Sequence, residues 1–409
     1  MMNILFYNYL PSLLIVLIPV LSLTGPFLPD FSLFIISIIF LYFIFKEKKW
    51  FYFNNKLVLF ISLFYLYIFL YSLYLKFFHN IDFDSQIFFF RFIIYFIAVG
   101  FWISQFKNLL KYLCISTLIA LIFCILDGYY QYFTGFNFFG IEKNGDRLGG
   151  IFGKESILGS YISRWLPLSI AIFFSIIYNF KKFYFISIIV IISSGIIIYL
   201  SGERAAVIIY ILSIFLISLS NYKNNSILRF LIFIPIIVSL FFFFNKDLNK
   251  RIFNETLNQI SYFFDDNANL ENKNSYDDVY RTSIDIFKNN KFFGVGPKNY
   301  ENYCLKNSKI NEKYYCTNHS HNYYLQILSE LGLVGLILFI FFIYVLLKFY
   351  IYNFKLIDNL YLFPIISFFV MFFPLYPHGS FYNGWLNTIG FFNLGIFYGY
   401  YCDYNKVKS

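Results

Sequence analysis

Histidine and arginine are the residue types in this sequence that could carry acid–base and anion-binding chemistry. Only four histidines occur in 409 residues, and His319 and His321 stand where the longest polar segment meets a long apolar one. An imidazole titrates near neutral pH and can accept a proton from a hydroxyl group. Arginine presents planar donors that match phosphate oxygens two at a time. These residue types could therefore supply a base and ligands for a phosphate group.

The composition places these residues in a membrane protein. Charged residues make up 13% of the chain, against ~25% in an average soluble domain. Apolar runs recur that are about long enough to cross the ~30 Å core of a bilayer as helices. We therefore predict an all-α polytopic membrane protein with about 12 transmembrane helices and a large periplasmic loop that carries short helices. The spans are expected near residues 6–23, 31–45, 57–74, 87–104, 112–126, 161–178, 184–200, 205–219, 227–244, 324–347, 361–376 and 384–400.

The distribution of positive charge predicts the topology. The net charge of +10 comes largely from lysines in short loops between spans, such as Lys46, Lys181 and Lys348. This is the positive-inside pattern. It explains the positive net charge without nucleic-acid binding, so we predict no nucleic-acid partner. The first hydrophobic run reads as a retained helix because no basic residue precedes it and no cleavage site follows it. Both termini are then cytoplasmic, and the polar loops 127–160 and 245–323 face outwards.

Three arginines lie where the membrane would make a charge expensive. Arg91 interrupts the fourth span, and Arg164 lies near the outer start of the sixth. Such arginines usually face a cavity or an anionic partner, although snorkelling to the headgroups suits Arg164. Arg204 follows Glu203 in a connection of almost no length, so it is pinned at the membrane surface. It could clamp a phosphate or simply pair with Glu203.

The large outer loop carries its own pattern in its second half. Residues 280–287 read as a helix, and residues 290–300 read as a turn with two glycines. Cys304 and Cys316 lie on the outer side, where an oxidising compartment favours a disulfide over two free thiols. No set of carboxylates and histidines has metal-ligand spacing, apart from His319 and His321 themselves.

The segment from His321 onwards predicts a helix with one special face. Read as a helix, the stripe runs through His321, Leu325, Leu328, Gly332 and Gly335. The glycines would let a neighbouring helix pack closely. A lone histidine at the membrane boundary is more often an interfacial polar residue than a catalyst. Arginines on the same outer side change that balance.

These residues resemble the O-antigen ligase and polymerase superfamily. His321-Asn322, nine residues, Gly332, two residues and Gly335 fit the histidine motif of that family. The glycine-rich loop 127–153, the turn 201–204 and the turn 377–383 are also similar to its pattern. The resemblance spans roughly residues 120 to 400.

The resemblance implies a metal-independent, inverting glycosyl transfer on the periplasmic face of a bacterial inner membrane. It implies a donor glycan on undecaprenyl diphosphate, a lipid A–core or other glycan as acceptor, and no cofactor. It makes His321 the catalytic base or acceptor-orienting group. It makes Arg204 and Arg281 the diphosphate ligands, with Arg91, Arg164 and Arg147 as further candidates.

The expected organisation follows from this resemblance. Residues 1–126 would form the N-terminal transmembrane helices, 127–400 the catalytic region, and 401–409 a cytoplasmic tail. An O-antigen polymerase that joins repeat units and a protein O-oligosaccharyltransferase share much of the layout and stay open. A transporter or flippase would also use buried arginines and broken helices, but the chain shows no convincing internal repeat.

Overall fold

The structure is a computed structural model of the whole chain. It describes residues 2–79, 85–106, 108–175, 181–220, 276–308, 314–353 and 357–408, together with 81, 250 and 252. The predicted span near 227–244 and most of residues 245–275 of the predicted outer loop lie outside this part.

The described residues form helices, and their only β structure is two isolated bridges between residues 136 and 142 and between 144 and 147. The predicted all-α membrane fold is confirmed. The helices are α1 (Met2–Leu21), α2 (Phe27–Glu47), α3 (Lys56–His79), α4 (Phe90–Gln105), α5 (Leu109–Thr134), α6 (Leu158–Ser175), α7 (Lys181–Leu200), α8 (Arg204–Ser220), α13 (Tyr276–Asn289), α14 (Tyr300–Ser308), α15 (Tyr323–Asn353), α16 (Asn359–Met371) and α17 (Gly384–Lys408), with short 3₁₀ turns at Ser22–Thr24, Trp50–Phe53, Ser85–Phe89 and Gly150–Glu155.

Each predicted span within the described residues coincides with one of these helices. Five helices are long and apolar enough to cross a membrane, by length and composition: Phe27–Glu47, Lys56–His79, Gln86–Gln105, Leu109–Thr134 and Tyr323–Tyr352. Five shorter apolar helices accompany them: Tyr9–Thr24, Leu158–Phe174, Phe185–Leu200, Arg204–Ser220 and Asn359–Met371.

Two of the expected boundaries fall inside helices. The boundary at residue 126 lies within α5, and the one at residue 400 lies within α17. Helix α5 continues beyond its apolar run because its next polar side chains find partners in the loop that folds back on it. Asp127 accepts a hydrogen bond from the Phe138 N–H at 2.8 Å, and Gln131 accepts one from the Gly150 N–H at 2.8 Å.

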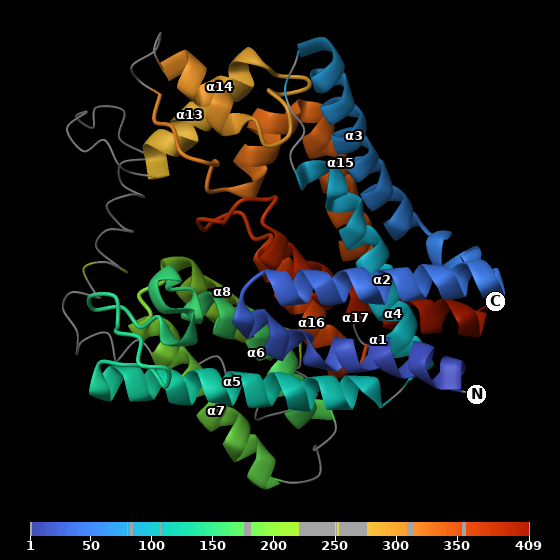
Figure 1. Cartoon of the computed structure of the whole chain (residues 1–409), viewed down its shortest axis with the longest axis vertical. Helices are drawn as coiled ribbons and strands as arrows, with labels where there is room; N and C mark the ends of the chain where they lie inside the picture. The colour runs from blue at the N-terminus through green and yellow to red at the C-terminus, as the bar shows by residue number, and fades with distance from the viewer. Residues whose placement is uncertain are drawn as a thin grey trace.

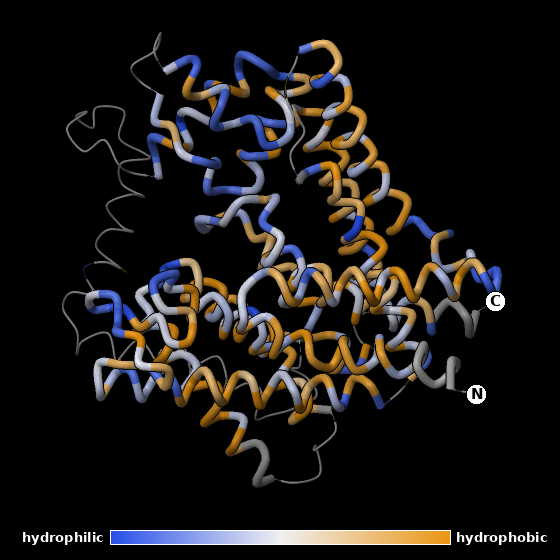
Figure 2. The backbone as a smooth tube through the Cα atoms, viewed as in Figure 1, coloured by the Kyte–Doolittle hydropathy of each residue, from blue (hydrophilic) through white to orange (hydrophobic). Residues whose placement is uncertain are grey.

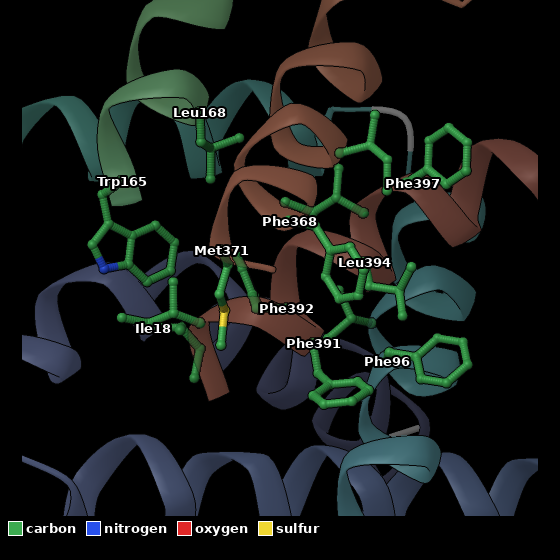
Figure 3. Packing of buried hydrophobic residues seen from close by; sticks show 14 of the residues in the cluster. Ile18, Phe96, Trp165, Leu168, Phe368, Met371, Phe391, Phe392, Leu394 and Phe397 are labelled. Carbon is green, nitrogen blue, oxygen red and sulfur yellow. The ribbon is translucent and has the colours of Figure 1, made fainter. Parts of the chain in front are cut away.

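The helices pack around a shared apolar core. Helices α2 and α5 cross the lower half of the molecule in Figure 1, whereas α3 and α15 rise together towards α13 and α14. Figure 3 shows side chains from α1, α4, α6, α16 and α17 in contact, among them Trp165, Phe368 and Phe391. Helices α4 and α17 approach backbone to backbone, since a Cβ on Gly395 would lie 2.8 Å from the Phe96 carbonyl oxygen.

Helices α13 and α14 form a small polar unit above the apolar helices. Figure 2 shows hydrophilic residues gathered there, whereas α2, α3, α5 and α15 are largely hydrophobic. Val279, Ile286, Val295, Tyr300 and Cys304 make a separate small core. A disulfide between Cys304 and Cys316 links α14 to the segment that leads into α15. The segment before His321 is thereby tied to this unit.

The turn that joins α13 to α14 docks on a kink in α15. The kink lies at Gly332, where φ is 65° and ψ is −163°, a region that only glycine adopts readily. The Leu333 N–H donates to the Lys291 carbonyl at 2.9 Å, and the Val295 N–H donates to the Ser329 carbonyl at 2.9 Å. Backbone groups released by the kink are therefore satisfied by the turn rather than by water.

The expectation of one helical stripe from His321 to Gly335 is wrong in two respects. Helix α15 begins at Tyr323, so His321 precedes it, and Gly332 departs from helical geometry. The segment that packs closely on Gly332 is the turn between α13 and α14 and not a helix. The backbone of this turn occupies the space where a side chain at position 332 would lie. Gly335 does face a helix, since a Cβ there would lie 3.3 Å from the Tyr67 ring of α3.

We expect Gly332→Ala to destabilise the protein strongly. A Cβ at this position would lie 2.3 Å from the Phe292 carbonyl oxygen, and the backbone strain alone costs roughly 1–3 kcal/mol. Thermal unfolding in detergent measures the effect. Gly384→Ala is the matched control because its Cβ would meet only the Arg91 guanidinium, at 3.6 Å. Equal melting temperatures for the two variants would contradict the docking role of Gly332.

Thiol counting tests the disulfide. The chain has five cysteines, and Cys114, Cys124 and Cys402 are free and buried. Denatured protein should therefore react at three cysteines without reductant and at all five after reduction. Cys304→Ala should expose Cys316 as one additional thiol and lower stability by roughly 3 kcal/mol in the chain-entropy account. Five reactive thiols before reduction would refute the bond.

Candidate active site

Three helix beginnings bring Arg204, Tyr276 and His321 together. Arg204 is the first residue of α8, Tyr276 is the first residue of α13, and His321 lies two residues before α15. The Arg204 Cζ lies over the Tyr276 ring, 5.4 Å from its centroid. The His321 ring meets the same tyrosine edge to face, with 5.1 Å between ring centroids. A guanidinium and an imidazole thus pack against one aromatic side chain.

Glu203 does not form the local pair with Arg204 that its position suggests. Its two carboxylate oxygens accept hydrogen bonds from the backbone N–H groups of Gly159 at 2.6 Å and Ser160 at 3.1 Å. These groups belong to the first turn of α6, where an acidic side chain is favoured by the helix dipole. The Arg204 guanidinium points instead to Tyr276. The sequence left open whether Glu203 pairs with Arg204. The partners it has instead, Gly159 and Ser160, are more than forty residues away.

His321 has an unusual backbone conformation that a later segment stabilises. Its φ is 50°, in the left-handed region that residues other than glycine rarely adopt. Its carbonyl accepts a hydrogen bond of 2.7 Å from the His378 N–H. Asn322 caps α15 by accepting from the Tyr324 and Leu325 N–H groups, and it donates to the Pro374 carbonyl at 2.8 Å. The segment between α16 and α17 therefore sets the direction of His321.

Three of the four histidines form one cluster. The His319 and His321 ring centroids are 4.1 Å apart, and His319 Nε2 lies 3.3 Å from the His378 carbonyl oxygen. The His378 ring is buried between Tyr323 and Tyr376, each at a centroid distance of 4.3 Å. Among the residues that the structure describes, the rings of Tyr276, Tyr323 and Tyr376 pack against the cluster.

This enclosure favours the neutral imidazoles. Burial, and next the neighbouring His321, lower the pKa of His319 to about 4. Burial, and next the Arg164 charge, lower the pKa of His378 to about 3. Burial also lowers the pKa of His321 below its ordinary value of 6.5, against an opposing contact with the His378 backbone. At neutral pH His321 is therefore uncharged and able to accept a proton.

Arg281 lies on α13, the helix that Tyr276 begins. Its Nε donates to Asp277 at 2.8 Å, within one turn of the helix. Its side chain is 47% exposed. Tyr280, the residue before it, lies close enough to Arg204 for that charge to act on its pKa, although burial raises the pKa overall. Tyr276 and Tyr280 thus lie near Arg204, whereas Arg281 pairs with Asp277 on the same helix.

Arg147 and Arg164 lie near Glu203, and their charges act on its carboxylate. Arg147 donates from Nε to the Ser201 carbonyl at 3.0 Å and is half-buried. Arg164 is buried and donates to the Ser160 carbonyl at 3.0 Å, and its charge acts on His378. These two arginines support the turn that carries Arg204 and the back of the histidine cluster.

Arg91 is placed differently from the other candidates. It lies in the first turn of α4, and its Nη2 is 3.0 Å from Asp30 Oδ1 of α2. The Arg91 guanidinium also lies over the Phe92 ring, 4.9 Å from its centroid. The structure thus gives Arg91 a partner of its own and does not bring it onto Tyr276.

Sequence reasoning missed Tyr276 and the part played by His378. Tyr276 stands in a polar stretch with no pattern around it, so nothing in the sequence singled it out. His378 stood in a turn that carried the family resemblance, and its pairing with His321 needed coordinates. In the part of the chain that the structure describes, no three His, Cys, Asp or Glu side chains are grouped to hold a metal ion.

The fold and the site together define a helical membrane protein with a polar unit over a histidine and arginine cluster. Residues 188–340 match the family model described as O-antigen ligase, and this match confirms the predicted resemblance to the O-antigen ligase-like superfamily. The match covers a little more than a third of the chain, less than the predicted 120–400. It includes Arg204, Arg281 and His321, and it excludes Arg91, Arg147 and Arg164. No curated protein matches the chain.

The buried histidines predict that acid destabilises the protein. The unfolded chain binds protons on histidine near pH ~6.5, whereas His319 and His378 titrate at about 4 and about 3. Below pH ~6.5 the unfolded state binds more protons, so stability falls as pH falls. Melting temperatures from pH 7.5 down to 5 measure this slope. His378→Phe should reduce the slope and the exposed His79→Phe should keep it, and equal slopes for both would contradict the assignment.

Proposed function

We propose that this chain is a membrane glycosyltransferase of the O-antigen ligase type. It moves a glycan from undecaprenyl diphosphate to a sugar hydroxyl of lipid A–core, on the periplasmic face of a bacterial inner membrane. The match over residues 188–340 supports an O-antigen ligase or polymerase family membrane enzyme. The ligase reaction, the undecaprenyl diphosphate donor and the lipid A–core acceptor are proposed in addition to this match.

The observation that carries the proposal is the shared packing of Arg204 and His321 on Tyr276. The His321 imidazole, as a base, and the Arg204 guanidinium, as a phosphate ligand, are thereby held in contact with the same tyrosine ring. The first turns of α8 and α13 meet there as well, and helix N-termini attract anions. A diphosphate bound by Arg204 would lie beside His321, the base that takes the proton of the acceptor hydroxyl.

The reaction is a single displacement with inversion. The acceptor oxygen attacks the anomeric carbon of the donor sugar while the bond from that carbon to the diphosphate oxygen breaks. The electron pair leaves with the diphosphate, and the acceptor hydroxyl passes its proton to the neutral imidazole of His321. Because the periplasm supplies no nucleotide, the lipid diphosphate itself provides the driving force.

The arginines act where negative charge develops. Arg204 and Arg281 would bind the departing diphosphate, and fixed donors in a poorly hydrated site stabilise such charge without reorganisation. The pair that Arg281 forms through Nε with Asp277 would hold its guanidinium in place for the phosphate oxygens. Arg147 and Arg164 support the site from behind Glu203. Arg91 is kept out of this role by its contact with Asp30.

Complementation of a deletion strain tests the proposal. His321→Ala should lower glycan attachment by ~10²-fold or more, since general base catalysis contributes that much. Arg204→Lys should also lower it strongly, because lysine cannot bind phosphate oxygens in pairs. The exposed His79→Ala serves as the control variant. Protein level and membrane insertion are measured alongside the glycolipid profile of each strain.

The same profile separates the ligase from its nearest relative. Long glycans that stay unattached on the lipid carrier in the deletion strain indicate a ligase. Single capped repeat units indicate a polymerase and would replace the proposed acceptor by another glycan. Normal attachment with His321→Ala at full protein level would remove this histidine from the mechanism.

A further inference from the structure

The groove between α2 and α4 has a chemistry that the proposed reaction does not use. It encloses a pocket of 380 Å³ lined by apolar residues of both helices, with Asp30 and Arg91 at one end. Phe31, Phe34 and Ile38 on its α2 wall are about half exposed, at 52%, 56% and 49%. In a membrane protein such a surface meets lipid. The geometry points to a binding site for a glycerophospholipid with a zwitterionic, primary-ammonium headgroup.

The ion pair at the end of the groove is incomplete. Arg91 Nη2 and Asp30 Oδ1 are 3.0 Å apart, whereas the buried Arg91 Nε has no hydrogen bond among the described residues. The Arg91 side chain is 28% exposed and the Asp30 side chain is 41% exposed, so both charged groups remain accessible from the groove. A cation and an anion side by side complement a headgroup that carries a phosphate and an ammonium.

The helix ends strengthen the phosphate half of this complement. Asp30 lies in the first turn of α2, and Arg91 lies in the first turn of α4. The ion pair therefore sits at the N-terminus of α2, whose dipole favours a negative group, and α4 continues there from the 3₁₀ turn Ser85–Phe89. A phosphate would take the Arg91 side, and an ammonium would donate to the Asp30 carboxylate.

The length of the groove matches one acyl chain in one leaflet. On α2 its lining runs from Asp30 through Phe34 and Ile38 to Leu41. The eleven residue steps from Asp30 to Leu41 rise about 16 Å, close to half of the ~30 Å hydrocarbon core. A lipid whose headgroup meets the ion pair would therefore lay one chain along α2 down to the middle of the bilayer.

The headgroup choice follows from the number of charges. Phosphatidylglycerol offers a phosphate but no cation for Asp30, and it would meet that carboxylate as a like charge. Phosphatidylcholine offers a cation that has no N–H to donate to the carboxylate. Phosphatidylethanolamine supplies both the phosphate and the donating ammonium, so it is the ligand that satisfies the pair. An undecaprenyl diphosphate would leave Asp30 opposed by additional negative charge.

Lipid titration of the full-length protein in mild detergent tests the site. Ile38→Trp places a fluorophore in the groove, and phosphatidylethanolamine with brominated acyl chains should quench it. Matched brominated phosphatidylglycerol and phosphatidylcholine should need roughly tenfold higher concentrations, the value of one charge-assisted hydrogen bond. Native mass spectrometry of the unsubstituted chain checks that the tryptophan has not created the site.

Three substitutions sharpen the assignment. Arg91→Gln should weaken phosphatidylethanolamine binding roughly tenfold, since it loses the phosphate contact. Asp30→Asn should remove the preference over phosphatidylglycerol. Lys49→Gln is the matched control because Lys49 forms a comparably exposed pair with Glu47, 2.6 Å apart.

Two results would overturn the proposal. One is equal binding of phosphatidylglycerol and phosphatidylethanolamine by the unsubstituted protein. The other is displacement of phosphatidylethanolamine by undecaprenyl diphosphate at a similar concentration, which would return Arg91 to the donor lipid. Neither measurement requires glycosyl transfer, so failure here is distinguishable from failure of the proposed reaction.

Discussion

The structure depends on backbone hydrogen bonds between the turn at residues 290–297 and the kinked helix α15. Peptide groups inside a membrane must be satisfied by protein, and a broken helix is stable only where another segment supplies partners. Gly332 breaks α15, and the turn takes up the released donors and acceptors. This contact fixes α13 on α15 and so decides where Tyr276 lies relative to His321. The motif glycine acts at a distance from the chemistry, by orienting the helix that contributes to it.

Much of the fold was predictable because its cause is local. Long apolar runs in a chain with few charges admit little besides membrane helices, and the described helices follow those runs. The helical reading of residues 280–287 succeeded for a similar reason, since polar and apolar residues alternate there with helical spacing. The helix ends were harder to predict. Asp127 and Gln131 extend α5 because a loop returns to bond them, and no short window of sequence contains that information.

The candidate site was predictable in its residue types and not in its arrangement. Arg204 and His321 could be singled out because an arginine pinned at the membrane surface lies on the same predicted outer side as the histidine, which alone would be read as an interfacial polar residue. Their common neighbour, Tyr276, is one of 38 tyrosines and carries no local signal. The orientation of Glu203 depended on the N-terminus of α6, and the backbone of His321 depended on His378. Each of these choices was decided by a partner distant in sequence.

The hydrogen bond from the His378 N–H to the His321 carbonyl has a consequence for biogenesis. Residue 378 is made after α15 and α16, so a nascent chain that has inserted α15 has not yet acquired the group that holds His321 in its left-handed conformation. Arg204, Tyr276 and His321 are therefore all synthesised before the group that supports the His321 backbone. The contact that supports the His321 backbone therefore forms last, with the segment that leads into α17. A chain shortened by its final two helices would lack the His378 N–H and so lose this support for the left-handed conformation of His321.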